Sequence, residues 1–372
     1  DLSGDKFLQV AIPIDEAITV FDENEEEVDM LIKHSGTTKA NNINLSVGSA
    51  KNLLARAVNI PGNLIATSAS QKDGVITLGG SGTIVVAGNL SAKENGKINI
   101  SGDFVSLGGT VDVSGSSAGS ISIKSEGETS ISAKLDASST NNEGGKINIT
   151  SSSKIVQSHG SLLNVSGQTS GGSIKLSSKG FISSGNIKAI GNSLKGGFVD
   201  IEASNDIRLL SSNIDASGNT QGGLIRVGGA FQGGNNLIRT SEQEQLFVNR
   251  WGTTPKIINA QKVLISDGSN IDISGSTGPG GSAIIWSDKE TTMLGNVKAN
   301  GTVGGAVEVS SKDTLRHVGL SNISISEGGH LLLDPKNITV GDVASSQNWI
   351  YRGLIGFDYS NTATNDSNNS YL

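Results

Sequence analysis

Two carboxylates occupy the same place in neighbouring copies of a short pattern, and their spacing could support chemistry. Asp112 lies in Val111-Asp112-Val113, and Asp136 lies in Leu135-Asp136-Ala137. If the two segments are aligned strands of adjacent coils, the carboxylates lie about 5 Å apart. Such a pair can shift each other's pKa or share a cation, and a retaining glycosidase uses two carboxyls at about this separation. One hypothesis is therefore a polysaccharide-cleaving hydrolase or lyase.

The surroundings of this pair favour a different interpretation. The same outward position continues as Asn164, Lys188 and Asp215, and the neighbouring residues are Ser and Asn rather than aromatics that could hold a sugar ring. Small-ligand sites are concave and partly apolar, whereas the side of a regular strand repeat is flat. We therefore predict a solvated pair, with no intrinsic catalysis and no bound cofactor.

Other motifs that could carry chemistry are weak. Residues 115–119 read Gly-Ser-Ser-Ala-Gly, which matches a nucleophile-elbow pattern but lies in a Gly/Ser-rich corner without the required strand–turn–helix context. The four histidines, at 34, 159, 317 and 330, show no metal-ligand spacing. Cysteine is absent, so disulfides and thiolate metal sites are excluded. We predict no metal site.

A repeat of about 25 residues positions all these side chains. A glycine is followed by four residues with apolar side chains at the second and fourth positions, as in Gly145-Lys-Ile-Asn-Ile and Gly172-Ser-Ile-Lys-Leu. The anchoring glycines of the ten copies are Gly74, Gly96, Gly119, Gly145, Gly172, Gly197, Gly223, Gly281, Gly305 and Gly329. Alternation of this kind predicts a strand with one dry face. The single 58-residue interval after Gly223 suggests a coil that has lost its motif.

Two further strands recur within each repeat. One resembles Val111-Asp112-Val113, and a weaker one lies before it, as in Phe181-Ile182. Three short strands per coil predict an all-β, right-handed parallel β-helix, a solenoid of about 25 residues per coil. In this fold, glycine at the corners would supply positive φ, and stacked aliphatic rows would form the core. The asparagines Asn186, Asn213, Asn270, Asn296 and Asn322 precede equivalent strands, which predicts a ladder of stacked amides.

Composition agrees with this fold and excludes several functions. Glycine occupies 50 of 372 positions, while aromatic residues make up only 4%. The 35 acidic and 28 basic residues give a net charge of −7, which argues against nucleic-acid binding. No apolar run is long enough to span a membrane.

The flanks and one insertion depart from the repeat. Residues 1–70 are predicted to form N-terminal coils with an acidic loop at 22–27, and Ser49 to Ile60 fits either a short helix or a strand. The regular β-helix is predicted over 71–340, and residues 341–372 form a terminal coil or frayed end.

The insertion, residues 229–260, carries the large apolar side chains Phe231, Leu246, Phe247 and Trp251. Loops on a rigid scaffold often carry recognition, and exposed aromatics often anchor it, so these residues are candidates for partner binding. The alternative is that they fold back and cover the coil that has lost its motif.

Several longer stretches resemble one family. Residues 35–80 resemble the stretch that follows the secretion domain in filamentous-haemagglutinin-like large exoproteins. Residues 281–319, the segment Gly-Gly-His-Leu-Leu-Leu-Asp at 328–334 with its continuation to 341, and Gly-Gly-Ala-Phe-Gln-Gly-Gly at 228–234 resemble further blocks of that family, in the same order.

This resemblance implies a Gram-negative protein exported by two-partner secretion, through an outer-membrane transporter that binds a separate N-terminal secretion domain. It implies a secreted or cell-surface β-helical stalk that mediates adhesion or displays a terminal effector. A host-cell, matrix or polysaccharide receptor is expected, and no enzymatic activity.

Overall fold

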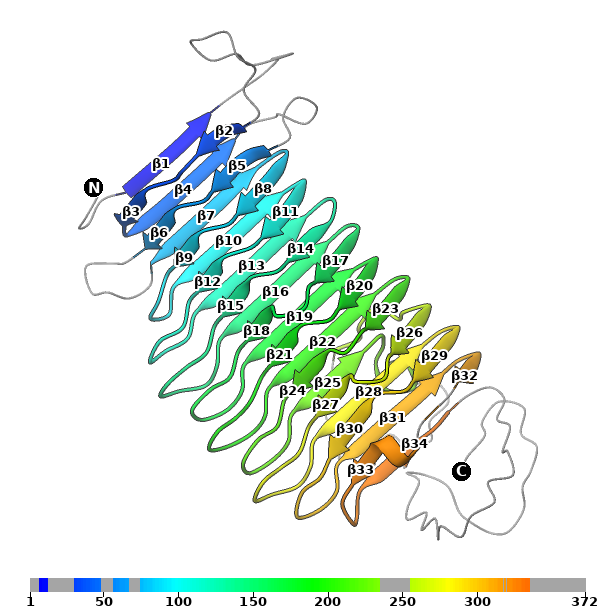
Figure 1. The fold of residues 1–372 in the computed structure, drawn as a ribbon. Coiled ribbons are helices and arrows are strands. Elements are labelled where there is room, and N and C mark those ends of the chain that lie inside the picture. Colours follow the sequence, from blue (N-terminus) through cyan, green and yellow to red (C-terminus); the bar gives the residue numbers. More distant parts are fainter. Residues whose placement is uncertain are drawn as a thin grey trace, which may run out of the picture.

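The protein is a parallel β-helix built from three long sheets. The computed structural model describes residues 7–12, 30–47, 56–66, 74–234 and 255–334, apart from 317 and 319. Within them the chain winds coil after coil from β1 (Phe7–Ile12) at one end to β34 (His330–Leu332) at the other, as Figure 1 shows. Every strand pairs in parallel with its equivalents in the preceding and following coils. The predicted β-helix with three strands per coil is confirmed.

Sheet 1 has 12 strands, and the glycine-anchored motif forms the ten from β7 to β34. Between β1 and β34 its strands are β4 (Asn42–Val47), β7 (Val75–Gly80), β10 (Lys97–Gly102), β13 (Ser120–Ser125), β16 (Lys146–Ser151), β19 (Ser173–Ser178), β22 (Phe198–Ala203), β25 (Leu224–Val227), β28 (Ser282–Ser287) and β31 (Ala306–Ser311). The motif positions align without a slip, so Ile147 pairs with Ile174 and Ile174 with Val199.

Sheets 2 and 3 have 11 strands each. Sheet 2 contains the weaker pattern, as in Phe181-Ile182, and sheet 3 contains the pattern of Val111-Asp112-Val113. Sheet 2 contains β2 (Met30–Lys33), β5 (Arg56–Ile60), β8 (Thr83–Val86), β11 (Phe104–Leu107), β14 (Thr129–Ile131), β17 (Lys154–Gln157), β20 (Gly180–Ser183), β23 (Asp206–Leu209), β26 (Lys262–Ile265), β29 (Glu290–Met293) and β32 (Thr314–Arg316). Sheet 3 contains β3 (Thr37–Ala40), β6 (Asn63–Ala66), β9 (Asn89–Ser91), β12 (Thr110–Asp112), β15 (Lys134–Asp136), β18 (Leu162–Asn164), β21 (Asn186–Lys188), β24 (Asn213–Asp215), β27 (Asn270–Asp272), β30 (Asn296–Ala299) and β33 (Ile323–Ile325).

The core lies inside the coils and consists of stacked aliphatic rows. Ile147 and Val199 are fully buried, and Ile174 is 1% exposed. The side chains between them on the same strands, such as Asn148 and Lys175, face outward and are exposed. Because alternate residues of a strand point to opposite faces, the alternation in the sequence decides which row is inside.

The corner glycines have a different role from the one predicted. None of the anchoring glycines within the described residues has positive φ. Instead, seven of them lie at a corner after sheet 3 where the backbones of adjacent coils nearly touch: Gly119, Gly145, Gly172, Gly197, Gly223, Gly281 and Gly305. A Cβ on Gly172 would lie 2.0 Å from the carbonyl oxygen of Gly145, and one on Gly197 would lie 2.2 Å from that of Gly172. The glycines are required because the backbones of successive coils approach each other closely.

The 58-residue interval is one coil with an insertion, which corrects the expectation of a coil without its motif. β25 pairs with both β22 and β28, so no strand of sheet 1 is missing between them. The extra residues lie between β25 and β26, at the corner from sheet 1 to sheet 2. Other coils cross that corner within a few residues, as between Ala203 and Asp206.

The asparagine ladder forms along most of its predicted length. The side-chain amide of Asn213 donates to Asn186 Oδ1 (3.2 Å), that of Asn270 to Asn213 Oδ1 (2.8 Å), and that of Asn296 to Asn270 Oδ1 (3.0 Å). Asn322 departs from the prediction, because it ends a 3-10 turn, η3 (Leu320–Asn322), and donates to the carbonyl of Leu294. A separate amide-to-amide hydrogen bond, from Asn89 to Asn63 Oδ1, lies near the N-terminal end.

At the N-terminal end, the alternative of a strand is confirmed for Arg56–Ile60, which form β5. The pairing of β4 with β7 continues sheet 1 across the predicted boundary near residue 70. The acidic run 22–27, the segment 48–55 and the predicted terminal region 341–372 lie outside the described residues.

Candidate functional site

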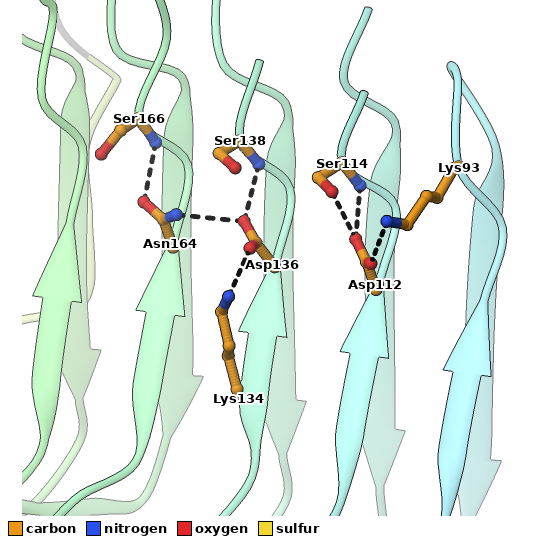
Figure 2. Close-up of polar contacts among 8 residues, drawn as sticks. All are labelled: Lys93, Asp112, Ser114, Lys134, Asp136, Ser138, Asn164 and Ser166. Carbon is orange, nitrogen blue, oxygen red and sulfur yellow. Dashed lines mark hydrogen bonds and ion pairs between the residues drawn. The ribbon is translucent and has the colours of Figure 1, made fainter. Parts of the chain in front are cut away.

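The carboxylates of Asp112 and Asp136 stand side by side on sheet 3, in the register expected from the sequence. β12 ends at Asp112 and β15 ends at Asp136, and the two residues are paired across the sheet. Figure 2 shows both side chains on the outer side of the strand ends, each turned toward its own following loop.

Each carboxylate of the pair already has several partners. Asp112 Oδ1 accepts hydrogen bonds from the backbone N–H and the hydroxyl of Ser114 (2.9 and 2.6 Å), and its Oδ2 lies 3.1 Å from Lys93 Nζ. Asp136 Oδ1 accepts from the N–H of Ser138 (3.0 Å) and from the amide of Asn164 (3.0 Å). Its Oδ2 lies 2.9 Å from Lys134 Nζ.

The electrostatics of Asp136 follow from these contacts. Burial alone would raise the pKa of this carboxyl, which is only 7% exposed. Hydrogen bonds from Ser138 and Lys134 outweigh the burial and hold the pKa below its usual value. The same contact with Asp136 raises the pKa of Lys134. A general acid needs a carboxyl with a raised pKa, so the shift at Asp136 is in the wrong direction for that role.

The contacts of Asp112 and Asp136 belong to a recurring turn. Asp or Asn is followed two residues later by Ser in five coils, and each time the serine N–H donates to the side-chain oxygen. The five pairs are Asp112–Ser114, Asp136–Ser138, Asn164–Ser166, Asp215–Ser217 and Asp272–Ser274. Such Asx turns stabilise the change of direction after a strand. The Asx-x-Ser spacing was a signal in the sequence that reasoning from paired carboxylates overlooked.

Asp136→Asn is expected to lower the free energy of unfolding at pH 7 by about 1 kcal/mol, because asparagine can still accept from Ser138 but loses the charge that binds Lys134. Because folding lowers the pKa of Asp136, its stabilisation is present above the ordinary carboxyl pKa and disappears as the pH falls through the lowered value. Denaturant titrations should therefore separate variant and wild type at pH 7 and bring them together in acid.

The matched control is Asp267→Asn, which removes one negative charge from an exposed loop. An equal loss of stability in both variants would mean that net charge, rather than the Lys134 contact, is responsible.

The remaining candidate motifs are separated in space. Ser117, at the nucleophile position of the Gly115–Gly119 motif, accepts a hydrogen bond at its hydroxyl from the side-chain amide of Asn142 (3.2 Å). His34 Nε2 lies 3.2 Å from the carbonyl oxygen of Asn63, and His159 is exposed on another coil. Within the described residues, no three His, Asp or Glu side chains are grouped so that they could hold a metal ion.

The insertion begins and ends on the outer face of sheet 1. Its described parts, residues 229–234 and 255–260, are here called the strap together with the adjoining Gly228 and Gln261. Phe231, which begins the turn η1 (Phe231–Gly234), is 6% exposed and belongs to one apolar cluster with Ile284 and Trp286 of β28. Phe231 therefore packs against sheet 1, as in the alternative in which the insertion folds back onto the coils. Leu246, Phe247 and Trp251 lie outside the described residues, so partner binding by them stays a prediction.

Charged groups of sheet 1 fix the strap through its backbone. Arg226 is 1% exposed and forms a two-pronged pair with Asp200 (2.7 and 2.6 Å), while its third nitrogen donates to the carbonyl of Pro255 (2.6 Å). Glu202 accepts from the N–H of Ile258 (3.0 Å), and Glu308, fully buried, accepts from that of Gln232 (3.1 Å).

Sequence reasoning missed this covered face, although a signal was present. Ile284 and Leu332 stand at an outward position of the motif where the other coils have polar or charged residues.

Comparisons with known proteins support the fold. No family model matches the chain, and no curated protein matches its sequence. Among solved structures, the secretion domain of HMW1 from Haemophilus influenzae is similar, with a TM-score of 0.50 and 21% identity over 82% of this chain and 88% of that chain. At this identity the likeness is one of fold alone. Within the described part of the chain, no helix is long and apolar enough to cross a membrane.

Proposed function

We propose that this chain is a β-helical stalk of a secreted or cell-surface exoprotein of a Gram-negative bacterium, and that it acts by attachment or by holding a further domain away from the cell. The observation that carries the proposal is the continuity of the three sheets, which keep one register from β1 to β34. A rigid repeat of this kind offers length and a large lateral surface.

The likeness to a domain named for secretion supports the exported character, as do the sequence blocks that resemble large exoproteins. The partner implied for export is an outer-membrane transporter of the two-partner type. To test export, the chain is fused behind a secretion domain of that type and expressed with the matching transporter. Protease-accessible chain on intact cells is expected only when the transporter is present; equal exposure without it would contradict the proposal.

We also propose that the stalk is not an enzyme. The support comes from Asp112 and Asp136, whose oxygens accept bonds from their own turn serines and contact their own lysines. A sugar oxygen would have to displace these contacts.

The test compares wild type with the double variant Asp112→Asn, Asp136→Asn on a panel of polysaccharides. We expect no release of reducing or unsaturated ends by either protein, together with measurable binding of wild type to host cells or matrix. Release by wild type that is abolished in the double variant would establish the enzymatic alternative instead.

A further inference from the structure

One stretch of the outer face of sheet 1 carries a lysine on each of four strands, with no acidic residue at an outward position of those strands. On four consecutive strands, β10, β13, β16 and β19, the outward positions hold Lys97, Lys124, Lys146 and Lys175, all exposed. The other outward residues of these strands are Ser, Thr and Asn. No outward position from β7 to β19 is acidic, in a chain with a net charge of −7. The four residues are called the lysine face.

Several lysines near the face are paired with acids. Lys93 in the turn after β9, Lys134 on β15 and Lys154 on β17 each contact a carboxylate, at 3.1, 2.9 and 3.5 Å. In the described part of the chain, Lys97, Lys124 and Lys146 have no such contact. Only Lys175, at the end of the face, contacts an acid, Glu202 at 3.3 Å.

The lysine face has a defined end. Beyond β19 the same outward row continues as Asp200 and Arg226, and there the strap covers the sheet. At that boundary Phe198 presents a ring that is 55% exposed, in the same row as Lys97 and Lys146. Lys97 and Lys146 are two strands apart, which is about 10 Å.

We propose that the lysine face binds an acidic polysaccharide that lies across the strands, with its carboxylate or sulfate groups at the lysines and a sugar ring against Phe198. This inference rests on the proposed adhesive function and names its surface and ligand class. The serine, threonine and asparagine side chains supply hydrogen bonds to hydroxyl groups, and the aromatic face accepts the apolar side of a ring.

Two other polyanions fit the lysine face less well. A membrane-binding surface needs an apolar layer that enters the lipid, and the outward residues here are polar apart from Phe198. Single-stranded nucleic acid is bound by several stacked aromatics in a basic groove, whereas this face is flat and has one ring.

The experiment measures equilibrium binding of the 372-residue chain to four probes: polygalacturonate, chondroitin sulfate, uncharged dextran and duplex DNA of matched length. The variant is Lys97→Gln, Lys124→Gln, Lys146→Gln. The control is Lys179→Gln, Lys289→Gln, Lys312→Gln, which removes the same charge from exposed lysines outside the face.

Wild type and control are expected to bind one or both acidic polysaccharides more tightly than dextran and DNA. The face variant should bind about tenfold more weakly and show a smaller dependence on salt. Phe198→Ala should weaken binding severalfold while leaving the salt dependence unchanged, because the ring carries no charge.

Equal affinity of face variant and control, or equal affinity of wild type for DNA, would overturn the inference. If the face variant still attaches to host cells as wild type does, adhesion depends on another surface, and only the proposed role of the lysine face is overturned. If wild type attaches to neither cells nor polysaccharide, the adhesive proposal fails with it.

Discussion

Ile147→Asp is expected to cost several kcal/mol of folding free energy, enough to leave the surrounding coils unfolded at room temperature. Ile147 is fully buried in the row between Ile121 and Ile174. A carboxylate there would lose its hydration and gain no partner, since its neighbours in the row are aliphatic. Denaturant titration followed by circular dichroism measures the loss.

The matched control is Asn148→Asp, one residue further along β16. Asn148 faces outward and is exposed, and its neighbour across the sheet is Lys175. The control should change stability by no more than about 0.5 kcal/mol. Similar losses in both variants would show that the inward and outward faces are assigned the wrong way round.

Gly172→Ala is the second substitution expected to be severe. The new Cβ would lie 2.0 Å from the carbonyl oxygen of Gly145, so one coil would have to move away from the next. A rotamer change cannot relieve this contact, because the backbone fixes the position of Cβ and its partner is a backbone oxygen. We expect a loss of about 3 kcal/mol or more, at the upper end of what overpacking costs.

Gly180→Ala, eight residues later in the same coil, is its control. Its Cβ would meet nothing closer than 3.5 Å, so stability should be kept or slightly increased. If the two variants melt alike in a thermal scan, then close approach at the corner is not what requires glycine.

The register could be predicted from the repeat because each coil buries the same apolar positions of the motif. A slip of one residue would expose Ile147 and Ile174 and bury Asn148 and Lys175, and every coil would have to slip together. The outward pairing of Asp112 with Asp136 follows from the same register.

Features that depend on contacts between distant residues could not be predicted in this way. The reason for the corner glycines lies in the distance between two coils, and not in the local φ preference of the residue. The strap depends on Gln232 meeting Glu308, 76 residues away, which no periodic pattern encodes. The roles of Ser114 and Ser138 were within reach, because the Asx-x-Ser spacing is local.

The strap also changes how the coils share their stability. In a plain solenoid each coil touches only its neighbours, so segments can open one after another from an end. Here Glu202 of β22 binds one arm of the strap and Glu308 of β31 binds the other, and the arms are joined by a hydrogen bond from Ala260 to Gly228. The coils from β22 to β31 are therefore tied into one cooperative block, while those before it can yield singly. A pull along the solenoid axis would meet a compliant segment followed by a stiff one.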